Sequence, residues 1–201
     1  MKPREFNWLK LKENFGIIAE TMAIEIEAKL KVDSHKQVIK RLKKLGAEFL
    51  SEHIQKDQYF DDVRQTLTKT DRGIRLRRQK SGNEEKIFLT YKGAREKDRF
   101  KKRQEIEMEI TDGDSVEKLL FAMGYEKAIV FEKKRRVYRL GGCEVALDEL
   151  PLLGSFVEIE GPDGEKIADV QKNLGLSDLP SIKESYAGLM AAKLKAGRSQ
   201  Q

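Results

Sequence analysis

The chain of 201 residues has few of the residue types that build disulfide frameworks and histidine-based sites. Its single cysteine, Cys143, excludes an internal disulfide and a thiolate metal cluster. Its two histidines, His35 and His53, argue against an all-histidine zinc site and a histidine-driven catalytic triad. No apolar run approaches the roughly 18 residues of a membrane span, and the N-terminus shows no apolar region of a secretory signal. We therefore expect a protein of the reducing cytoplasm with no membrane partner.

Charged residues, by contrast, are abundant. Asp, Glu, Lys and Arg make up 37% of the chain, compared with about 25% in an average domain. Forty basic residues against 34 acidic ones leave a net charge of +6. The hydrophobic fraction of 39% exceeds that of a disordered chain, but it can build a core only if the apolar residues are strictly patterned. The length favours a single domain.

Residues 24–32, IEIEAKLKV, show such a pattern. Because successive side chains of a strand point to opposite faces, the even positions would form a wholly apolar face. The odd positions would form a wholly charged face of Glu25, Glu27, Lys29 and Lys31. A helical period follows over residues 35–45, with Ser34 as the expected N-cap and Gly46 as the expected stop.

The same unit recurs 80 residues later, since residues 25–48 resemble residues 105–126. Both segments predict a strand, an acidic or serine cap, an amphipathic helix, a glycine and a further strand. The match includes Glu25 with Glu105 and Glu27 with Glu107. A repeat at this spacing predicts two similar halves that close on each other.

Several other segments alternate in the same way. We expect further strands at residues 58–60, 73–79, 86–92, 103–111, 129–139, 143–149 and 155–160, which makes about eight in all. We expect helices at residues 35–45, 115–123, 164–173 and 184–195. Residues 22–197 would form one domain, and residues 1–21 an extension that is disordered or weakly ordered. Alternatively, Phe6, Leu9 and Leu11 in that extension dock on the body or on a partner.

Each charged face could be the solvated side of a half-buried antiparallel sheet. The faces taken together favour a closed barrel, because a barrel of about eight strands can hold one small ligand and has no open edge. An interior with many cations and several carboxylates suits a polyphosphate bound with a divalent metal. The sequence has no phosphate-binding glycine loop of the P-loop or dinucleotide type, so side chains must make the phosphate site.

Several motifs carry a family resemblance, and they occur in a fixed order along residues 23–195. The first is Glu25-Ile-Glu27-Ala-Lys29 on the first alternating strand. The later motifs are Gln58-Tyr59-Phe60-Asp61, Arg75-Leu76-Arg77, Thr90-Tyr91-Lys92-Gly93, Arg103-Gln104-Glu105-Ile106-Glu107, Lys133-Lys134-Arg135, Leu147-Asp148-Glu149, residues 154–161 (GSFVEIEG) and Glu184-Ser185-Tyr186. Together they resemble the CYTH domain, or triphosphate tunnel metalloenzyme, superfamily, and most of all its class IV adenylyl cyclase-like branch.

The resemblance implies an α+β fold, in which an eight-stranded antiparallel closed barrel is surrounded by helices and made of two similar halves. It implies catalytic roles for Glu25, Glu27 and Lys29. It implies a triphosphate-binding set of Lys29, Arg75, Arg77, Lys92, Arg103, Lys133 and Arg135. It also implies a set of ligands for Mg²⁺ or Mn²⁺ that comprises Glu25, Glu27, Asp148, Glu158 and Glu160. If the strand over residues 129–139 has a bulge, Lys134 and Arg136 replace Lys133 and Arg135.

The favoured activity is an adenylyl cyclase that converts ATP to cyclic AMP and pyrophosphate. The alternative is a triphosphatase acting on inorganic triphosphate, thiamine triphosphate or a nucleoside triphosphate, and it stays open because residues 19–22 lack the His-Phe pair of some cyclases. A third hypothesis is a non-enzymatic binder of polyphosphate or RNA through the basic segment Lys36, Lys40, Arg41, Lys43 and Lys44. We expect a triphosphate small molecule and not a nucleic acid as the partner, and a homodimer stays open.

Overall fold

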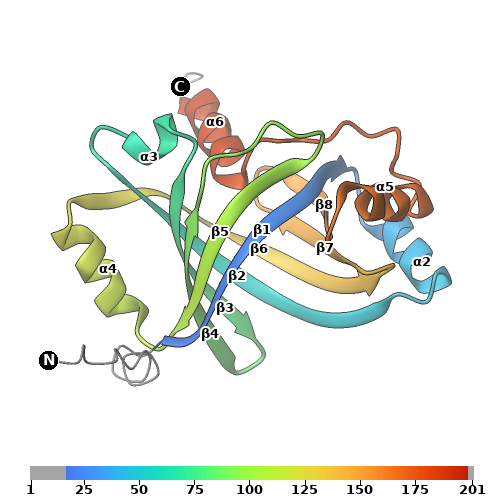
Figure 1. Ribbon diagram of the computed structural model, residues 1–201, viewed down its shortest axis with the longest axis horizontal. Helices are drawn as coiled ribbons and strands as arrows, with labels where there is room; N and C mark the ends of the chain where they lie inside the picture. The colour runs from blue at the N-terminus through green and yellow to red at the C-terminus, as the bar shows by residue number, and fades with distance from the viewer. Residues whose placement is uncertain (1–16, 199–201) are drawn as a thin grey trace, which may run out of the picture.

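The computed structural model describes residues 17–198, whose eight strands close into one antiparallel barrel (Figure 1). Neighbouring strands follow the order β1-β5-β4-β3-β2-β6-β7-β8, and β8 pairs with β1 to close the barrel. The strands are β1 (Ile17–Val32), β2 (Glu48–Asp62), β3 (Gly73–Ser81), β4 (Glu84–Lys92), β5 (Lys101–Ile110), β6 (Tyr125–Leu140), β7 (Cys143–Leu150) and β8 (Gly154–Glu160). The predicted fold class is thereby confirmed.

Strands β1 and β2 exceed their predicted lengths the most. In place of the expected short strand at residues 58–60, β2 has 15 residues. Its inward positions His53, Gln55 and Asp57 are polar, so no apolar face reveals the strand. Strand β1 begins at Ile17, inside the segment that was expected to be an extension. The predicted docking of Phe6, Leu9 and Leu11 lies outside the described residues.

The helices lie outside the barrel, as predicted. They are α2 (Lys36–Lys44), α3 (Thr66–Lys69), α4 (Gly113–Ala122), α5 (Gly164–Asn173) and α6 (Tyr186–Arg198), of which the single turn α3 was not expected. Asp112 caps α4 by accepting hydrogen bonds from the backbone N–H groups of Asp114 and Ser115. The expected cap of α2 is wrong: its N-cap is His35 and not Ser34, and His35 Nε2 lies 2.9 Å from the Phe156 carbonyl oxygen instead. No helix among residues 17–198 is long and apolar enough to cross a membrane.

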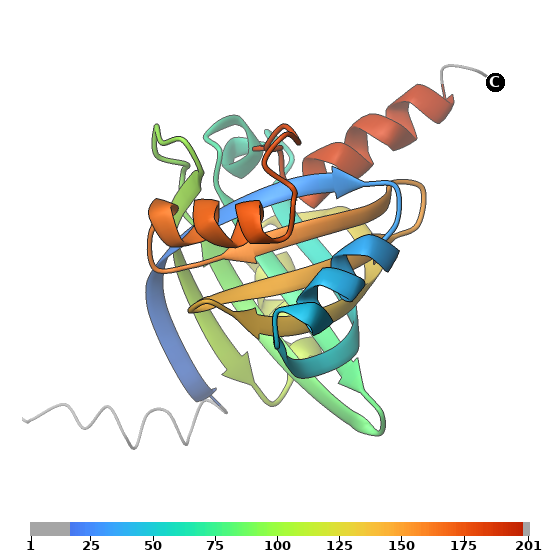
Figure 2. The same ribbon diagram turned by 90° about the vertical axis from the view of Figure 1, so that its right-hand side faces the viewer.

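The apolar faces of the strands pack outward against these helices. Figure 2 shows α2 and α5 against the outside of the barrel. Leu30 and Ile159 lie in one core with Leu42 of α2 and with Ile167 and Val170 of α5. A second core joins Leu76 to Leu120 of α4. A third core joins Tyr186 of α6 to Phe156, which lies on the same face of β8 as Glu158, so this core lies on the inner side of the barrel. Because helices cover the apolar faces on the outside, the charged faces point into the barrel.

The strand order preserves the internal repeat. If β1, β2, β3 and β4 are exchanged with β5, β6, β7 and β8, every neighbouring pair maps onto another neighbouring pair. The helix after β1 likewise corresponds to the helix after β5, which are α2 and α4. The two halves thus have the same topology, and they exchange their first strands, because β1 pairs with β5 and β8 while β5 pairs with β1 and β4.

Candidate functional site

The charged faces enclose a cavity of about 760 Å³ inside the barrel. Residues of α3, of the segment before β5 and of the start of α6 line one end of the cavity, which we call its mouth. Figure 1 shows these segments at the same end of the barrel. The structure places every predicted site residue except Asp148 on its wall. These residues are Glu25, Glu27, Lys29, Arg75, Arg77, Lys92, Arg103, Lys133, Arg135, Glu158 and Glu160. The cavity volume falls in the range of about 300–1,000 Å³ that is usual for small-molecule sites.

Glutamates of β1 and β8 form an acidic side of the cavity. Strand pairing sets Glu27 beside Glu160 and Lys29 beside Glu158. Partial burial, together with the carboxylates of Glu25 and Glu27, raises the pKa of Glu160 to about 7. The negative charge at this end of the cavity therefore exceeds what the neighbouring cations neutralise.

Lys101 of β5 contacts this acidic side. Its Nζ donates a hydrogen bond to Glu27 Oε1 at 2.6 Å and to Glu25 Oε2 at 3.4 Å. Burial disfavours the ammonium, but the two glutamates outweigh it and raise the pKa of Lys101 above its ordinary value. Lys101 is absent from the predicted site because the strand is predicted to begin at residue 103. Lys101 lies two positions before Arg103 and therefore on the same face of a strand, and this spacing is the sequence signal that could have predicted it.

The donor chemistry of the acidic side fits a divalent metal. Mg²⁺ and Mn²⁺ prefer carboxylate oxygens, which Glu25, Glu27, Glu158 and Glu160 supply. The raised pKa of Glu160 points the same way, because a bound dication would relieve the repulsion that causes it. Among residues 17–198 no three acidic, histidine or cysteine side chains already form a complete metal site. Lys101 and Arg135 are ion-paired with these glutamates instead.

The opposite side of the cavity presents an arginine held by a buried aspartate. Arg77 Nε donates to Asp57 Oδ1 at 2.6 Å and Arg77 Nη2 to Asp57 Oδ2 at 2.8 Å. Burial tends to raise the pKa of Asp57, but the Arg77 guanidinium outweighs it and keeps the pKa below its usual range. This two-pronged contact fixes the plane of the guanidinium, which is the geometry that arginine uses to bind phosphate. Asp57 was not predicted because the sequence pattern of β2 hides its strand.

Asp148 lies behind the wall and not on it. Its side chain is completely buried, and its carboxylate accepts hydrogen bonds from Lys133 Nζ at 3.0 Å and from Arg135 Nε at 2.7 Å. Arg135 also contacts Glu158. Burial, reinforced by the nearby Arg135 guanidinium, lowers the pKa of Lys133 to about 7 despite the Asp148 carboxylate. In this arrangement Asp148 orients two cations of the cavity wall, which differs from the metal-binding role predicted for it.

The register of β6 decides between the two predicted pairs of cations. Lys133 and Arg135 line the cavity. Lys134 points outward and pairs with Glu52. The irregularities between β2 and β6 fall elsewhere, near Phe49 and Tyr59, so no bulge shifts this part of the strand.

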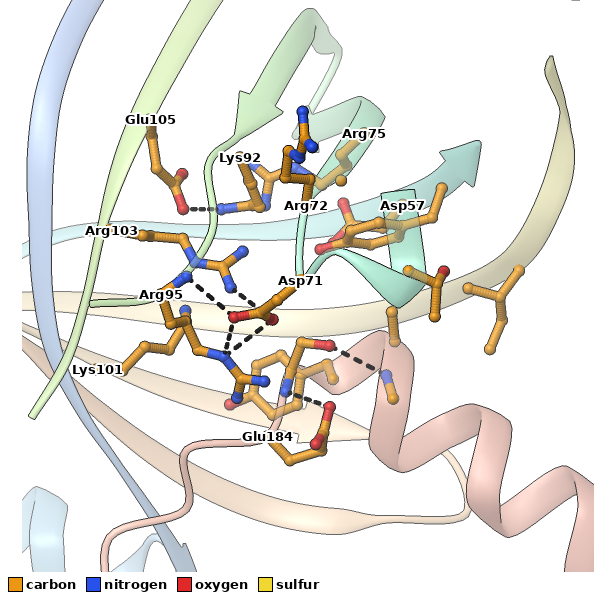
Figure 3. A pocket seen from close by; sticks show the side chains of 18 of the residues that line it. Asp57, Asp71, Arg72, Arg75, Lys92, Arg95, Lys101, Arg103, Glu105 and Glu184 are labelled. Atoms are coloured by element: carbon orange, nitrogen blue, oxygen red, sulfur yellow. Dashed lines mark hydrogen bonds and ion pairs between the residues drawn. The ribbon is translucent and has the colours of Figure 1, made fainter. Parts of the chain in front are cut away.

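Pairs of opposite charge continue along β3, β4 and β5. Lys92 Nζ contacts Glu105 (Figure 3), and Arg75 Nη2 donates to Glu107 Oε2 at 3.0 Å. Thr90 Oγ1 donates to the same Glu107 oxygen at 2.8 Å. The second acidic pair of the repeat thus neutralises two predicted phosphate-binding cations.

The mouth of the cavity carries an ionic cluster that sequence patterns did not predict. Figure 3 shows Asp71 between Arg95 and Arg103. Asp71 accepts hydrogen bonds from the Arg95 backbone N–H at 2.9 Å and from its Nε at 2.8 Å, and Arg103 Nη2 lies 3.4 Å away. Asp71 has a φ of 54°, which lies in the left-handed region. It follows α3, a segment with no strand alternation, so no sequence signal marks it.

Comparisons with known proteins agree with this geometry. The family model described as "CYTH domain" matches residues 23–186. A Methanocaldococcus jannaschii protein named "putative adenylate cyclase" is 31% identical over 175 residues, which cover 83% of this chain and 98% of that protein. A solved Pyrococcus horikoshii structure has a TM-score of 0.74 at 29% identity, over 84% of this chain and 99% of that one.

A solved Hippeastrum structure is similar in fold alone, with a TM-score of 0.63 at 19% identity over 86% of this chain and 96% of that one. That protein is described as a "putative adenylyl cyclase" that "reveals a dominant" triphosphatase activity.

Proposed function

The chain belongs to the CYTH domain family, and on that premise we propose that it is a divalent-metal-dependent enzyme that cyclises ATP to cyclic AMP and pyrophosphate. The observation that supports this proposal is one cavity whose wall combines a glutamate cluster with buried arginines and lysines. Buried charges without partners would cost several kcal/mol each. Such a wall therefore suits a ligand that carries both negative and positive charge. A triphosphate bound with a divalent cation is such a ligand.

In this proposal each side of the cavity has its own task. Glu25, Glu27 and Glu160 would hold the divalent ion, in competition with the Lys101 ammonium that now contacts two of them. When bound, the ion would act as a Lewis acid on phosphate oxygens. Arg77 on the opposite side, with its plane fixed by Asp57, would bind non-bridging phosphate oxygens.

Four further cations would surround the phosphate chain: Lys29, Arg75, Lys92 and Lys133. Each now has a carboxylate partner in the free protein, which holds the cation in position until substrate arrives. Fixed cations that face the leaving pyrophosphate would stabilise the negative charge that develops there. The buried setting strengthens this effect, because it excludes water from the phosphates.

The proposed reaction needs the α-phosphate at the acidic side. The ribose 3′-oxygen forms a bond to the α-phosphorus, while the bond from that phosphorus to the bridging oxygen of pyrophosphate breaks. The hydroxyl proton passes to solvent, and pyrophosphate leaves with the bonding electron pair. The attacking and leaving oxygens must lie in line. We favour this reaction because the Methanocaldococcus jannaschii relative, at 31% identity over nearly its whole length, is named for it.

Hydrolysis is the second candidate, and the mouth of the cavity favours it. Basic side chains continue along the wall to the entrance of the cavity, where a nucleoside would lie; they are Lys69, Arg72 and Arg95. A compact and wholly anionic substrate such as inorganic triphosphate would suit this entrance. Water would then attack the terminal phosphorus, with the same residues binding the phosphates. The Hippeastrum protein of the same fold is described with a dominant triphosphatase activity.

Product analysis distinguishes the two reactions. The purified protein is incubated with Mg²⁺ or Mn²⁺ and, separately, with ATP, thiamine triphosphate and inorganic triphosphate, and an EDTA-treated sample serves as the control. We expect cyclic AMP and pyrophosphate in equal amounts from ATP, and no products after chelation. Orthophosphate without cyclic nucleotide would contradict cyclisation and support the triphosphatase. No turnover of any substrate would contradict both reactions and favour a binding role.

A further inference from the structure

Tyr186, the first residue of α6, carries a polar atom that the contacts described so far leave unused. Its side chain is 7% exposed and lies on the cavity wall. Among the described residues its hydroxyl oxygen has no hydrogen-bond partner. A buried hydroxyl without a partner costs about 1–3 kcal/mol, so native proteins seldom leave one in place without a use for it.

The ring of Tyr186 lies between two of the proposed phosphate-binding cations. Lys29 Nζ is 4.4 Å from the ring centroid, and Lys133 Nζ is 4.8 Å from it. Phe156 packs against the ring edge-on at 5.2 Å between centroids. These contacts fix the ring, and the ring in turn fixes the directions of the two ammonium groups. An anion that both ammoniums bind would therefore lie next to the hydroxyl.

The hydroxyl is equipped to donate and not to lose its proton. Burial, followed by the carboxylates of Glu158 and Asp148, raises the pKa of Tyr186 well above its ordinary value. Asp148, whose carboxylate acts on this hydroxyl, accepts hydrogen bonds from Lys133 and Arg135, and its contact with the hydroxyl lacks the geometry of a hydrogen bond. The hydroxyl is thus a protonated donor that still needs an acceptor.

We propose that Tyr186 is a substrate-binding residue whose hydroxyl donates a hydrogen bond to a non-bridging phosphate oxygen held by Lys29 and Lys133. The inference rests on the proposed triphosphate site, and it extends that site from the barrel strands to α6. A hydrogen bond to a charged acceptor is stronger than one to a neutral acceptor. Its loss should therefore weaken triphosphate binding by about 10-fold to 100-fold.

The test compares Tyr186→Phe with Tyr138→Phe by titration calorimetry, with inorganic triphosphate as the probe in the presence and absence of Mg²⁺. Tyr138 is the matched control, because it is also a buried tyrosine but lies on β6 and packs against Phe49 outside the cavity. We expect the dissociation constant to rise about 10-fold or more for Tyr186→Phe and to change less than about twofold for Tyr138→Phe.

Thermal unfolding supplies a second readout. Because Tyr186→Phe removes an unpartnered hydroxyl and keeps the ring, the free variant should melt no lower than the wild type, while inorganic triphosphate should raise its melting temperature less. Wild-type affinity in Tyr186→Phe would overturn the inference and leave the proposed function intact. If the wild type itself fails to bind inorganic triphosphate, the proposed function fails, and the inference fails with it.

Discussion

Replacing Glu25 by glutamine is expected to lower turnover by about 1,000-fold or more while the fold stays intact. Glutamine keeps the shape of the side chain but removes the charge that a divalent ion requires, and such an ion contributes several kcal/mol to transition-state stabilisation. The fold should persist because Lys101 retains its closer contact with Glu27 at 2.6 Å when the 3.4 Å contact with Glu25 is weakened. Initial rates on the preferred triphosphate, with metal ion varied, measure the effect.

The matched control for this change is Glu52→Gln. Glu52 also lies on a strand and pairs with a lysine, Lys134, but outside the cavity. The Glu52→Gln substitution should leave the turnover rate and its dependence on metal-ion concentration unchanged. Glu27→Gln should lose turnover as well, but it is the less clean variant because Lys29 and Lys101 both contact Glu27. A Glu25→Gln protein with near-normal, metal-dependent activity would remove Glu25 from the metal site.

Replacing Asp148 by asparagine should destabilise the fold more than any of the Glu→Gln or Tyr→Phe substitutions. The substitution leaves Lys133 and Arg135 beside a neutral amide at a position where the side chain is completely buried. Breaking one partner of a buried ion pair costs about 3–5 kcal/mol, which for a chain of this length lowers the melting temperature by about 10 °C. Thermal unfolding in metal-free buffer measures the loss.

Glu149→Gln provides the comparison, because Glu149 is the exposed neighbour of Asp148 on β7 and lies outside the cavity. It should melt within about 2 °C of the wild type, since exposed charges contribute little. The experiment also separates the two roles considered for Asp148. Unchanged stability combined with weakened Mn²⁺ binding in Asp148→Asn would contradict the positioning role and restore the predicted role as a metal ligand.

The barrel was predictable where one face of a strand is apolar. In β1 the apolar residues Ile26, Ala28 and Leu30 alternate with charged residues, so the strand and its inward face are both visible in the sequence. In β2 the inward residues His53 and Asp57 are polar and the outward ones are mixed, so alternation vanishes and most of the strand is missed. Burial of a polar side chain depends on partners from other strands, which a local pattern does not contain.

The same reasoning explains which site residues could be predicted. Charged residues that share the alternation of a recognised strand, such as Glu158 and Arg77, were predicted and line the cavity. Asp71 and Arg95 come from irregular segments that meet only through the fold. Alternation predicts that the Asp148 carboxylate points into the barrel, but it does not predict the partner of that carboxylate. In the structure the partner is the neighbouring Arg135 and not a ligand in the cavity.

The most direct test of the triphosphate tunnel is a crystal structure of the protein grown with Mn²⁺ and inorganic triphosphate, with Mn²⁺ located by its anomalous scattering. The expected result is a Mn²⁺ peak about 2.0–2.6 Å from carboxylate oxygens of Glu25, Glu27 and Glu160. The phosphate groups should lie between that ion and the side chains of Arg77 and Lys133. Mn²⁺ and triphosphate bound only outside the barrel, with the cavity free of both, would contradict it.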